Sequence, residues 1–288
     1  MIGFVGTHID DFIHCGKEGC DEEVMNRLRK RFTPGKLEEG SFTYVGFEIE
    51  QHAGLLDKNE KKQFRSLTGK CNWAKPDICY DVIEMSSKLK QRKVDDMLRV
   101  NKVINQLKEG SVTVFYPYIG SVETWDLLVV SDASFANLSD GVSSCGHIIL
   151  IVGEQSKCCV IAWMSKKIKR VVRSTLVVEM LSLTEALEHS IYLKKILTEV
   201  INGPALNIFA VVDNKSVVDA LFSTICTDDK RLRVDVGGVK EMMNDHIVTS
   251  VRCIPGCEML ADLLTKRGVE KFSILNMLKK GKCNIRYK

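Results

Sequence analysis

The chain of 288 residues has no long apolar run. Its longest runs, such as 148–152, are far shorter than the roughly 18 residues that a membrane-spanning helix needs. No apolar leader with a small-residue cleavage site opens the chain, the 11 cysteines are scattered, and no C-x-x-C pair occurs. These absences predict a protein with no membrane partner in a reducing, intracellular compartment, cytoplasmic or nuclear, and they disfavour a structural zinc site.

The chain also lacks a strong net charge. It has 41 Lys and Arg residues against 37 Asp and Glu residues, a balance of only +4. This excludes a protein that coats a polyanion with its whole surface, so any nucleic-acid site must be a local patch. The apolar content of 45% is enough to fill the cores of two domains, and the length leaves room for both.

The second half of the chain contains four acids at the ends of predicted elements. The runs 127–130 and 206–212 are typical of buried strands, and they lead to Asp132 and Asp213. Glu179 lies in the first turns of a predicted helix capped by Ser174, and Asp262 lies in a predicted helix over 259–266. Strand and helix ends meet at one edge of a mixed sheet, so these acids can converge, although Asp132 and Asp213 taken singly are also explained as turn residues.

Four carboxylates in one place need cations to neutralise them. Two Mg²⁺ ions, or Mn²⁺ in their place, are the usual solution for attack on a phosphodiester. A basic segment precedes the Glu179 helix and is the candidate for gripping phosphates, with an ordinary solvated loop as the alternative. Its cations are Lys166, Lys167, Lys169, Arg170 and Arg173.

The remaining pattern of the second half predicts an α/β arrangement. Short apolar runs at 145–152 and 159–164 favour an antiparallel meander after the Asp132 strand. A helix over 231–243 is weakened by Gly237 and Gly238, and a strand over 248–254 precedes the last helix. The region 110–124 loses helical period, which places a domain boundary there.

The first half begins with a strand-like run followed by Asp10 and Asp11. Paired aspartates at a hairpin tip can hold a divalent cation, but a solvated Asp-Asp turn is the simpler explanation from composition. Helices are predicted over 21–32, 76–89 and 94–108, and the alternation in 42–50 predicts a half-buried strand.

Four motifs of the second half, in order, resemble the ribonuclease H domain of copia-type LTR retrotransposon polyproteins. They are Ser131–Asn137, Ile161–Lys167 leading to Ser174–Glu179, Val212–Ser216 and Leu260–Lys266. The resemblance covers 125–270 and implies a ribonuclease H-like mixed five-stranded sheet with flanking helices. It further implies a metal-dependent endonuclease that hydrolyses the RNA strand of RNA–DNA hybrids.

In that resemblance the four acids are the catalytic metal ligands. Asp132 bridges two ions, Glu179 and Asp213 complete one site, and Asp262 completes the other. The histidine that some ribonucleases H carry just before the last acid has no counterpart in the loop 254–258.

The first half is similar to the end of the reverse transcriptase of the same polyprotein. The resemblance rests on His8–Asp11, Tyr44–Ile49, Phe64–Gly69 and Lys75–Ile78. It implies that 1–110 is an α+β palm, thumb and connection remnant in which Asp10 and Asp11 are vestigial polymerase residues. The third aspartate and the fingers of such a polymerase are not present in the sequence, so polymerase activity is not expected in this chain alone.

The complete expectation is therefore a remnant over 1–110, a linker over 111–124, the ribonuclease H-like domain over 125–270 and a basic tail over 271–288. Three functions stay open: a working ribonuclease H, a catalytically inactive or decayed remnant that only binds nucleic acid, and a partial RNA-directed DNA polymerase. The last needs the missing N-terminal half, and that half or other polyprotein products are the expected protein partners.

Overall fold

The computed structural model describes two compact units, which meet in the sequence between Leu56 and Asp57. This boundary lies upstream of the predicted linker over 111–124. The predicted division into a remnant over 1–110 and a domain over 125–270 stays a prediction. The described residues are 3–8, 11–16, 30, 41–44, 47–50, 56–71, 76–87, 93–109, 114–138, 141–224 and 229–288.

The first unit contains two antiparallel hairpins. Strands β1 (Gly3–His8) and β2 (Asp11–Gly16) pair so that His8 lies opposite Asp11. Strands β3 (Ser41–Tyr44) and β4 (Phe47–Glu50) also pair with each other, where the sequence predicted a single strand over 42–50. Alternating apolar residues do not distinguish one strand from two short strands of a hairpin. Asp10 and the predicted helix over 21–32 lie outside the described residues.

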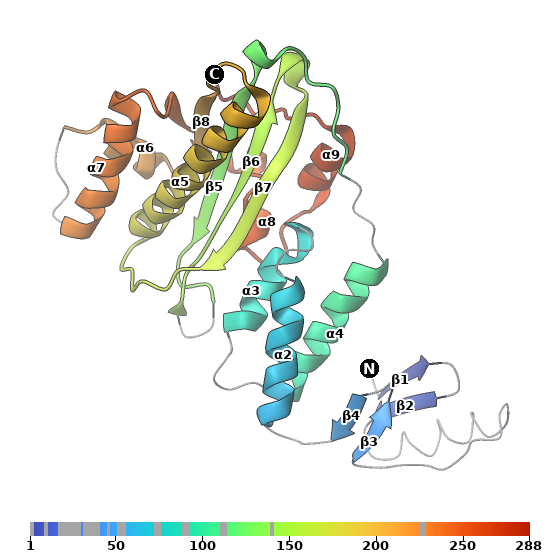
Figure 1. Ribbon diagram of the computed structural model, residues 1–288. Coiled ribbons are helices and arrows are strands. Elements are labelled where there is room, and N and C mark those ends of the chain that lie inside the picture. Colours follow the sequence, from blue (N-terminus) through green and yellow to red (C-terminus); the bar gives the residue numbers. More distant parts are fainter. Residues whose placement is uncertain are drawn as a thin grey trace. The chain divides into compact units, whose positions relative to one another are not determined.

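The second unit begins with three helices and continues with a five-stranded sheet (Figure 1). The helices are α2 (Lys58–Cys71), α3 (Cys79–Ser87) and α4 (Val94–Glu109). The strands are β5 (Asp126–Ser134), β6 (Ser144–Val152), β7 (Cys158–Lys167), β8 (Asn207–Val212) and β9 (Ser250–Cys253).

The sheet is mixed, with the order β7-β6-β5-β8-β9. Strands β5, β6 and β7 form the predicted antiparallel meander, whereas β8 lies parallel to β5 and β9 lies parallel to β8. With helices on both faces, this is the predicted ribonuclease H-like architecture, a mixed five-stranded sheet with flanking helices. The apolar run of β5 is buried on both sides, which explains why it does not alternate with polar residues.

One face of the sheet is covered by α5 (Thr175–Ile201) and α6 (Lys215–Phe222), and α7 (Lys230–Asn244) packs against these two helices (Figure 1). Helix α5 begins where the Ser174 hydroxyl accepts a hydrogen bond from the backbone N–H of Val177, and it ends at Asn202, whose backbone is left-handed. Helix α7 is continuous through Gly237 and Gly238, because Leu232, Val236 and Val239 anchor it to the core.

The opposite face is covered by α8 (Asp262–Thr265) and α9 (Phe272–Lys280). The last predicted helix is thus shorter than the expected 259–266, since residues 256–258 form a separate turn of 3₁₀ helix. The segment predicted as a basic tail, 271–288, contains α9. Ile274, Met277 and Cys283 are buried in this side of the core, so 271–288 is part of the folded unit.

A histidine pair, with His147 buried and His189 half-buried, joins β6 to α5. The Nε2 atom of His147 lies 2.9 Å from Nδ1 of His189. Burial, followed by the neighbouring His189 and Lys166, lowers the pKa of His147 from 6.5 to about 3.

No described helix has both the length and the apolar character that crossing a bilayer requires.

Candidate functional site

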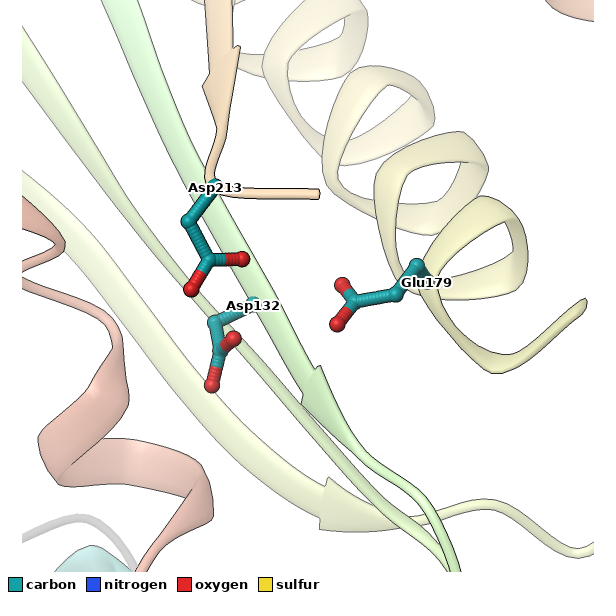
Figure 2. Close-up of side chains that lie close together, drawn as sticks. All are labelled: Asp132, Glu179 and Asp213. Carbon is teal, nitrogen blue, oxygen red and sulfur yellow. The ribbon is translucent and has the colours of Figure 1, made fainter. Parts of the chain in front are cut away.

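Three of the four predicted acids meet at one end of the central strands (Figure 2). Asp132 belongs to β5, Asp213 directly follows β8, and Glu179 projects from the first turns of α5. One carboxylate oxygen from each residue lies within 4.8 Å of the other two. The predicted convergence of these three side chains is therefore present in the structure.

The sheet topology brings two of these acids together. Because β5 and β8 are neighbouring parallel strands, with Val130 paired to Val211, their carboxyl ends point to the same edge of the sheet. Helix α5 crosses β5 and adds the third acid. The Ser182 hydroxyl donates a 2.8 Å hydrogen bond to the backbone oxygen of Asp132 and fixes this crossing.

Burial makes it costly for two acids of the cluster to carry a negative charge. Asp132 is fully buried and Glu179 is 5% exposed. Burial raises the pKa of Asp132 to about 7, although Lys266 and Thr265 act in the opposite direction. Burial, followed by the charges of Asp132 and Asp213, raises the pKa of Glu179 to about 9. A carboxyl with such a pKa is in the environment that a bound cation would relieve.

One oxygen of Glu179 points to what would fill this site. The Oε2 atom is buried and has no hydrogen-bond partner. Buried polar oxygens are normally paired, and a group of three carboxylates offers only acceptors. A hard divalent cation such as Mg²⁺ or Mn²⁺ prefers carboxylate oxygens, so the donor set and the orphaned oxygen both fit a cation of this class.

Asp262 lies beside this cluster rather than within it. It is the first residue of α8, and its Oδ1 atom accepts a hydrogen bond from Nζ of Lys266, four residues later. The same Nζ atom lies 3.4 Å from Oδ1 of Asp132. The other oxygen of Asp132 accepts a hydrogen bond from the Thr265 hydroxyl. The fourth predicted ligand is thus joined to the first through a lysine.

Helix α8 is held tightly against β6 next to the acids. Gly146 pairs with Asp132, and a Cβ atom at this glycine would lie 2.6 Å from Cβ of Leu264. The backbone oxygen of Thr265 accepts hydrogen bonds from the Asn137 side chain at 2.7 Å and from the Ser144 hydroxyl at 3.0 Å. These contacts fix the position of the Thr265 and Lys266 side chains at Asp132.

The predicted basic segment begins at the same edge of the sheet as the acids. Lys167, at the end of β7, pairs with Ser144 of β6, which in turn pairs with Ser134 of β5, two residues after Asp132. Two of its five cations are already engaged in the fold: Lys166 forms an ion pair with Glu185 and Arg170 forms one with Asp235. The other three cations of this segment, Lys167, Lys169 and Arg173, form no ion pair with any described residue.

Several residues of the site had no predicted role. Ser182 and Gly146 carry no sequence signal of function, because their contacts join elements far apart in the chain. Thr265 and Lys266 lie in the fourth motif, but the motif gives their side chains no task. The spacing of four residues between Asp262 and Lys266 is the signal from which their ion pair follows, since such residues are neighbours on a helix.

Comparison with known proteins gives similarities of structure only. No protein-family model and no curated protein sequence matches the chain. Among solved structures, the LC11 ribonuclease H1 isolated from compost is 15% identical, with a TM-score of 0.37, over 49% of this chain and 92% of that one. The ribonuclease H1 of the archaeon Halobacterium salinarum is 18% identical, with a TM-score of 0.36, over 52% and 98%.

A foamy viral protease-reverse transcriptase in complex with an RNA/DNA hybrid is also similar. It is 11% identical, with a TM-score of 0.37, over 64% of this chain and 28% of that one. At such identities and TM-scores these similarities carry no inference about the activity of this chain, which must be argued from its own residues.

Proposed function

We propose that the chain contains a divalent-cation-dependent endonuclease that hydrolyses the RNA strand of RNA–DNA hybrids. The observation that carries the proposal is the cluster of Asp132, Glu179 and Asp213 at one edge of the sheet, which has a buried oxygen without a partner. Clusters of acids in this state are typical of metal-assisted attack on phosphodiesters.

The cluster residues would hold the cation through their carboxylate oxygens. Mg²⁺ or Mn²⁺ bound there supplies Lewis-acid stabilisation of charge at a phosphate and lowers the pKa of a water. The chain itself orients the cluster: Ser182 and Thr265 hold Asp132 from opposite sides, through its backbone oxygen and its carboxylate. In the copia-type resemblance Asp262 completes a second cation site. In this structure the carboxylate of Asp262 forms an ion pair with Lys266.

The substrate would be gripped by the unpaired cations at the start of the α5 region. Lys167 ends β7 at the edge of the sheet that carries the acids, and Lys169 and Arg173 follow it in the chain. Cations of this kind contact phosphates without reading bases, and hybrids are distinguished by shape and by 2′-hydroxyls. We therefore expect little sequence preference in cleavage.

The origin that we propose is a copia-type LTR retrotransposon polyprotein. It is supported by the order and spacing of the four motifs around Asp132, Glu179, Asp213 and Asp262. Polymerase activity by this chain alone is not proposed, because the third aspartate and the fingers of such a polymerase are not present in the sequence. The missing reverse transcriptase half, or other products of the polyprotein, would be its protein partners.

A cleavage assay tests this function. Labelled RNA annealed to DNA is incubated with the full chain and Mg²⁺ or Mn²⁺, and cleavage is followed on a denaturing gel. Asp132→Asn is expected to abolish cleavage, whereas Asp219→Asn, at an exposed position of α6, is expected to leave it unchanged. If the wild-type chain binds the hybrid but does not cut it in the presence of either Mg²⁺ or Mn²⁺, the nuclease proposal is wrong and the chain is a nucleic-acid-binding remnant.

A further inference from the structure

Lys266 places a positive charge inside the acidic site. Its Nζ atom forms an ion pair with Asp262 and lies 3.4 Å from Oδ1 of Asp132. The Asp132 side chain is fully buried, and the lysine side chain reaches it from a position where 37% of its surface is exposed. A single ammonium group thus connects the fourth acid to the central acid of the cluster.

This arrangement uses both oxygens of Asp132. Oδ1 faces the Lys266 ammonium, and Oδ2 accepts the hydrogen bond of the Thr265 hydroxyl. A cation shared by Asp132 and Asp262 would have to lie between their carboxylates, which is where the ammonium lies. An ammonium group and a divalent cation held between the same two carboxylates repel each other strongly in a partly desolvated site. The lysine and a divalent ion therefore compete for the same place.

The cluster of Asp132, Glu179 and Asp213 contains two acids, Glu179 and Asp213, with which Lys266 forms no ion pair. Its oxygens lie within 4.8 Å of one another, and Oε2 of Glu179 has no partner. Asp213 directly follows β8 and Glu179 belongs to α5, and in Figure 2 their carboxylates lie beside that of Asp132. The three-acid cluster can therefore take a cation while Lys266 stays on Asp262.

We propose that Lys266 supplies the positive charge between Asp132 and Asp262, so that the site binds one divalent cation instead of two. This inference rests on the proposed function, because it presumes a cation at Asp132, Glu179 and Asp213. Lys266 is then a positioning residue that acts through the two aspartates. The Gly146 contact with Leu264 keeps α8 close enough to β6 for the lysine to reach Asp132.

The number of bound ions tests the inference without relying on activity. Mn²⁺ is titrated into the full chain, and the free ion is measured by its EPR signal. The wild-type chain is expected to bind one Mn²⁺. Lys266→Met, which removes the charge and keeps much of the side chain, is expected to bind two, and Lys266→Arg, which restores the charge, is expected to bind one.

Matched controls separate charge from folding. Lys195→Met makes the same change at an exposed position of α5, about 24 Å along the helix axis from Glu179 at 1.5 Å per residue, and is expected to bind one Mn²⁺. Circular dichroism checks that each variant is folded. Lys266→Gln, which also removes the charge and is expected to bind two Mn²⁺, takes the place of Lys266→Met if the methionine variant does not fold.

Each other result overturns a defined part of the account. Two ions bound by the wild-type chain overturn the inference and leave the proposed nuclease intact. One ion bound by both wild type and a folded Lys266→Met shows that the lysine is not what excludes the second ion. If the wild-type chain binds no Mn²⁺ at all, the metal-dependent function and the inference are both overturned.

Discussion

Replacing Glu179 with glutamine is expected to stabilise the protein when no divalent cation is present. The pKa of Glu179 is raised from 4.5 to about 9 by burial and by the charges of Asp132 and Asp213. Between these pKa values the folded state keeps a proton that the unfolded state has released. The stability that this group contributes is complete below pH 4.5 and is lost as pH rises toward 9. Glutamine is neutral at every pH and avoids this loss.

The size of the wild-type loss in unfolding free energy follows from how far the pH lies above the unfolded-state pKa of Glu179. At pH 7 this difference is 7 − 4.5 = 2.5 units, which corresponds to about 3 kcal/mol at ~1.4 kcal/mol per unit. The pKa of Asp132 is itself raised to about 7, and its ionisation over the same range takes up part of the difference. We expect Glu179→Gln to raise the free energy of unfolding by about 2 kcal/mol, and Tm by roughly 5 °C.

The assay is urea unfolding from pH 5 to pH 8.5 in the presence of a chelator. The fluorescence of Trp125 and Trp163 reports on the unit that holds the site. The difference between Glu179→Gln and wild type should grow with pH, and adding Mn²⁺ should reverse the order, because only the wild type keeps the full set of ligands. Glu188→Gln, at an exposed position of α5, is the control and should match the wild type. A wild-type chain as stable as Glu179→Gln at pH 8 without cations would refute the reasoning.

Two further predictions concern the histidine pair and the basic segment. His147→Gln should remove an acid sensitivity of the wild type, because the lowered pKa of His147 means that stability is complete above pH 6.5 and is lost as pH falls toward 3, by about 2 kcal/mol at pH 5. Urea unfolding measures this, with His246→Gln in an exposed turn as the control, and an unchanged acid limb would contradict it. The second prediction concerns the unpaired cations of the basic segment, Lys167, Lys169 and Arg173. Replacing each with glutamine should reduce the slope of log binding constant against log salt concentration by about 1 in hybrid-binding titrations. Slopes equal to that of the wild type would show that these cations do not contact phosphate.

The sheet and the three-acid cluster could be predicted because they follow from local patterns. The apolar runs before Asp132 and Asp213 mark buried strands, and parallel pairing of β5 with β8 then forces the two acids to one edge. Glu179 follows from the Ser174 cap, which fixes where α5 begins and so which turn carries the acid. These features depend on a few neighbouring residues each.

The surroundings of Asp262 could not be predicted in the same way. The place of α8 is set by its close approach to β6 at Gly146 and by hydrogen bonds from Asn137 and Ser144, residues more than 100 positions away from it in the sequence. For this reason the lysine between Asp132 and Asp262 is visible only in the folded chain.

Two other segments show tertiary packing acting against local signals. The spacing of Ile274, Met277 and Leu278 is that of a helix face, which the prediction of a basic tail over 271–288 left unused. The glycine pair of α7 costs about 1 kcal/mol per residue relative to alanine, which the packing of Leu232 and Val239 offsets. In both cases tertiary contacts outweigh local propensity.

The ends of the cleaved RNA strand test the central claim most directly. Hydrolysis at the cluster of Asp132, Glu179 and Asp213, with the 3′ oxygen leaving, gives a 5′-phosphate and a 3′-hydroxyl. We predict these ends when an RNA–DNA hybrid is treated with the wild-type chain and Mg²⁺, and no cleavage with a chelator or with Asp132→Asn. An uncut hybrid, or cyclic phosphate ends that form without any divalent cation, would contradict the account.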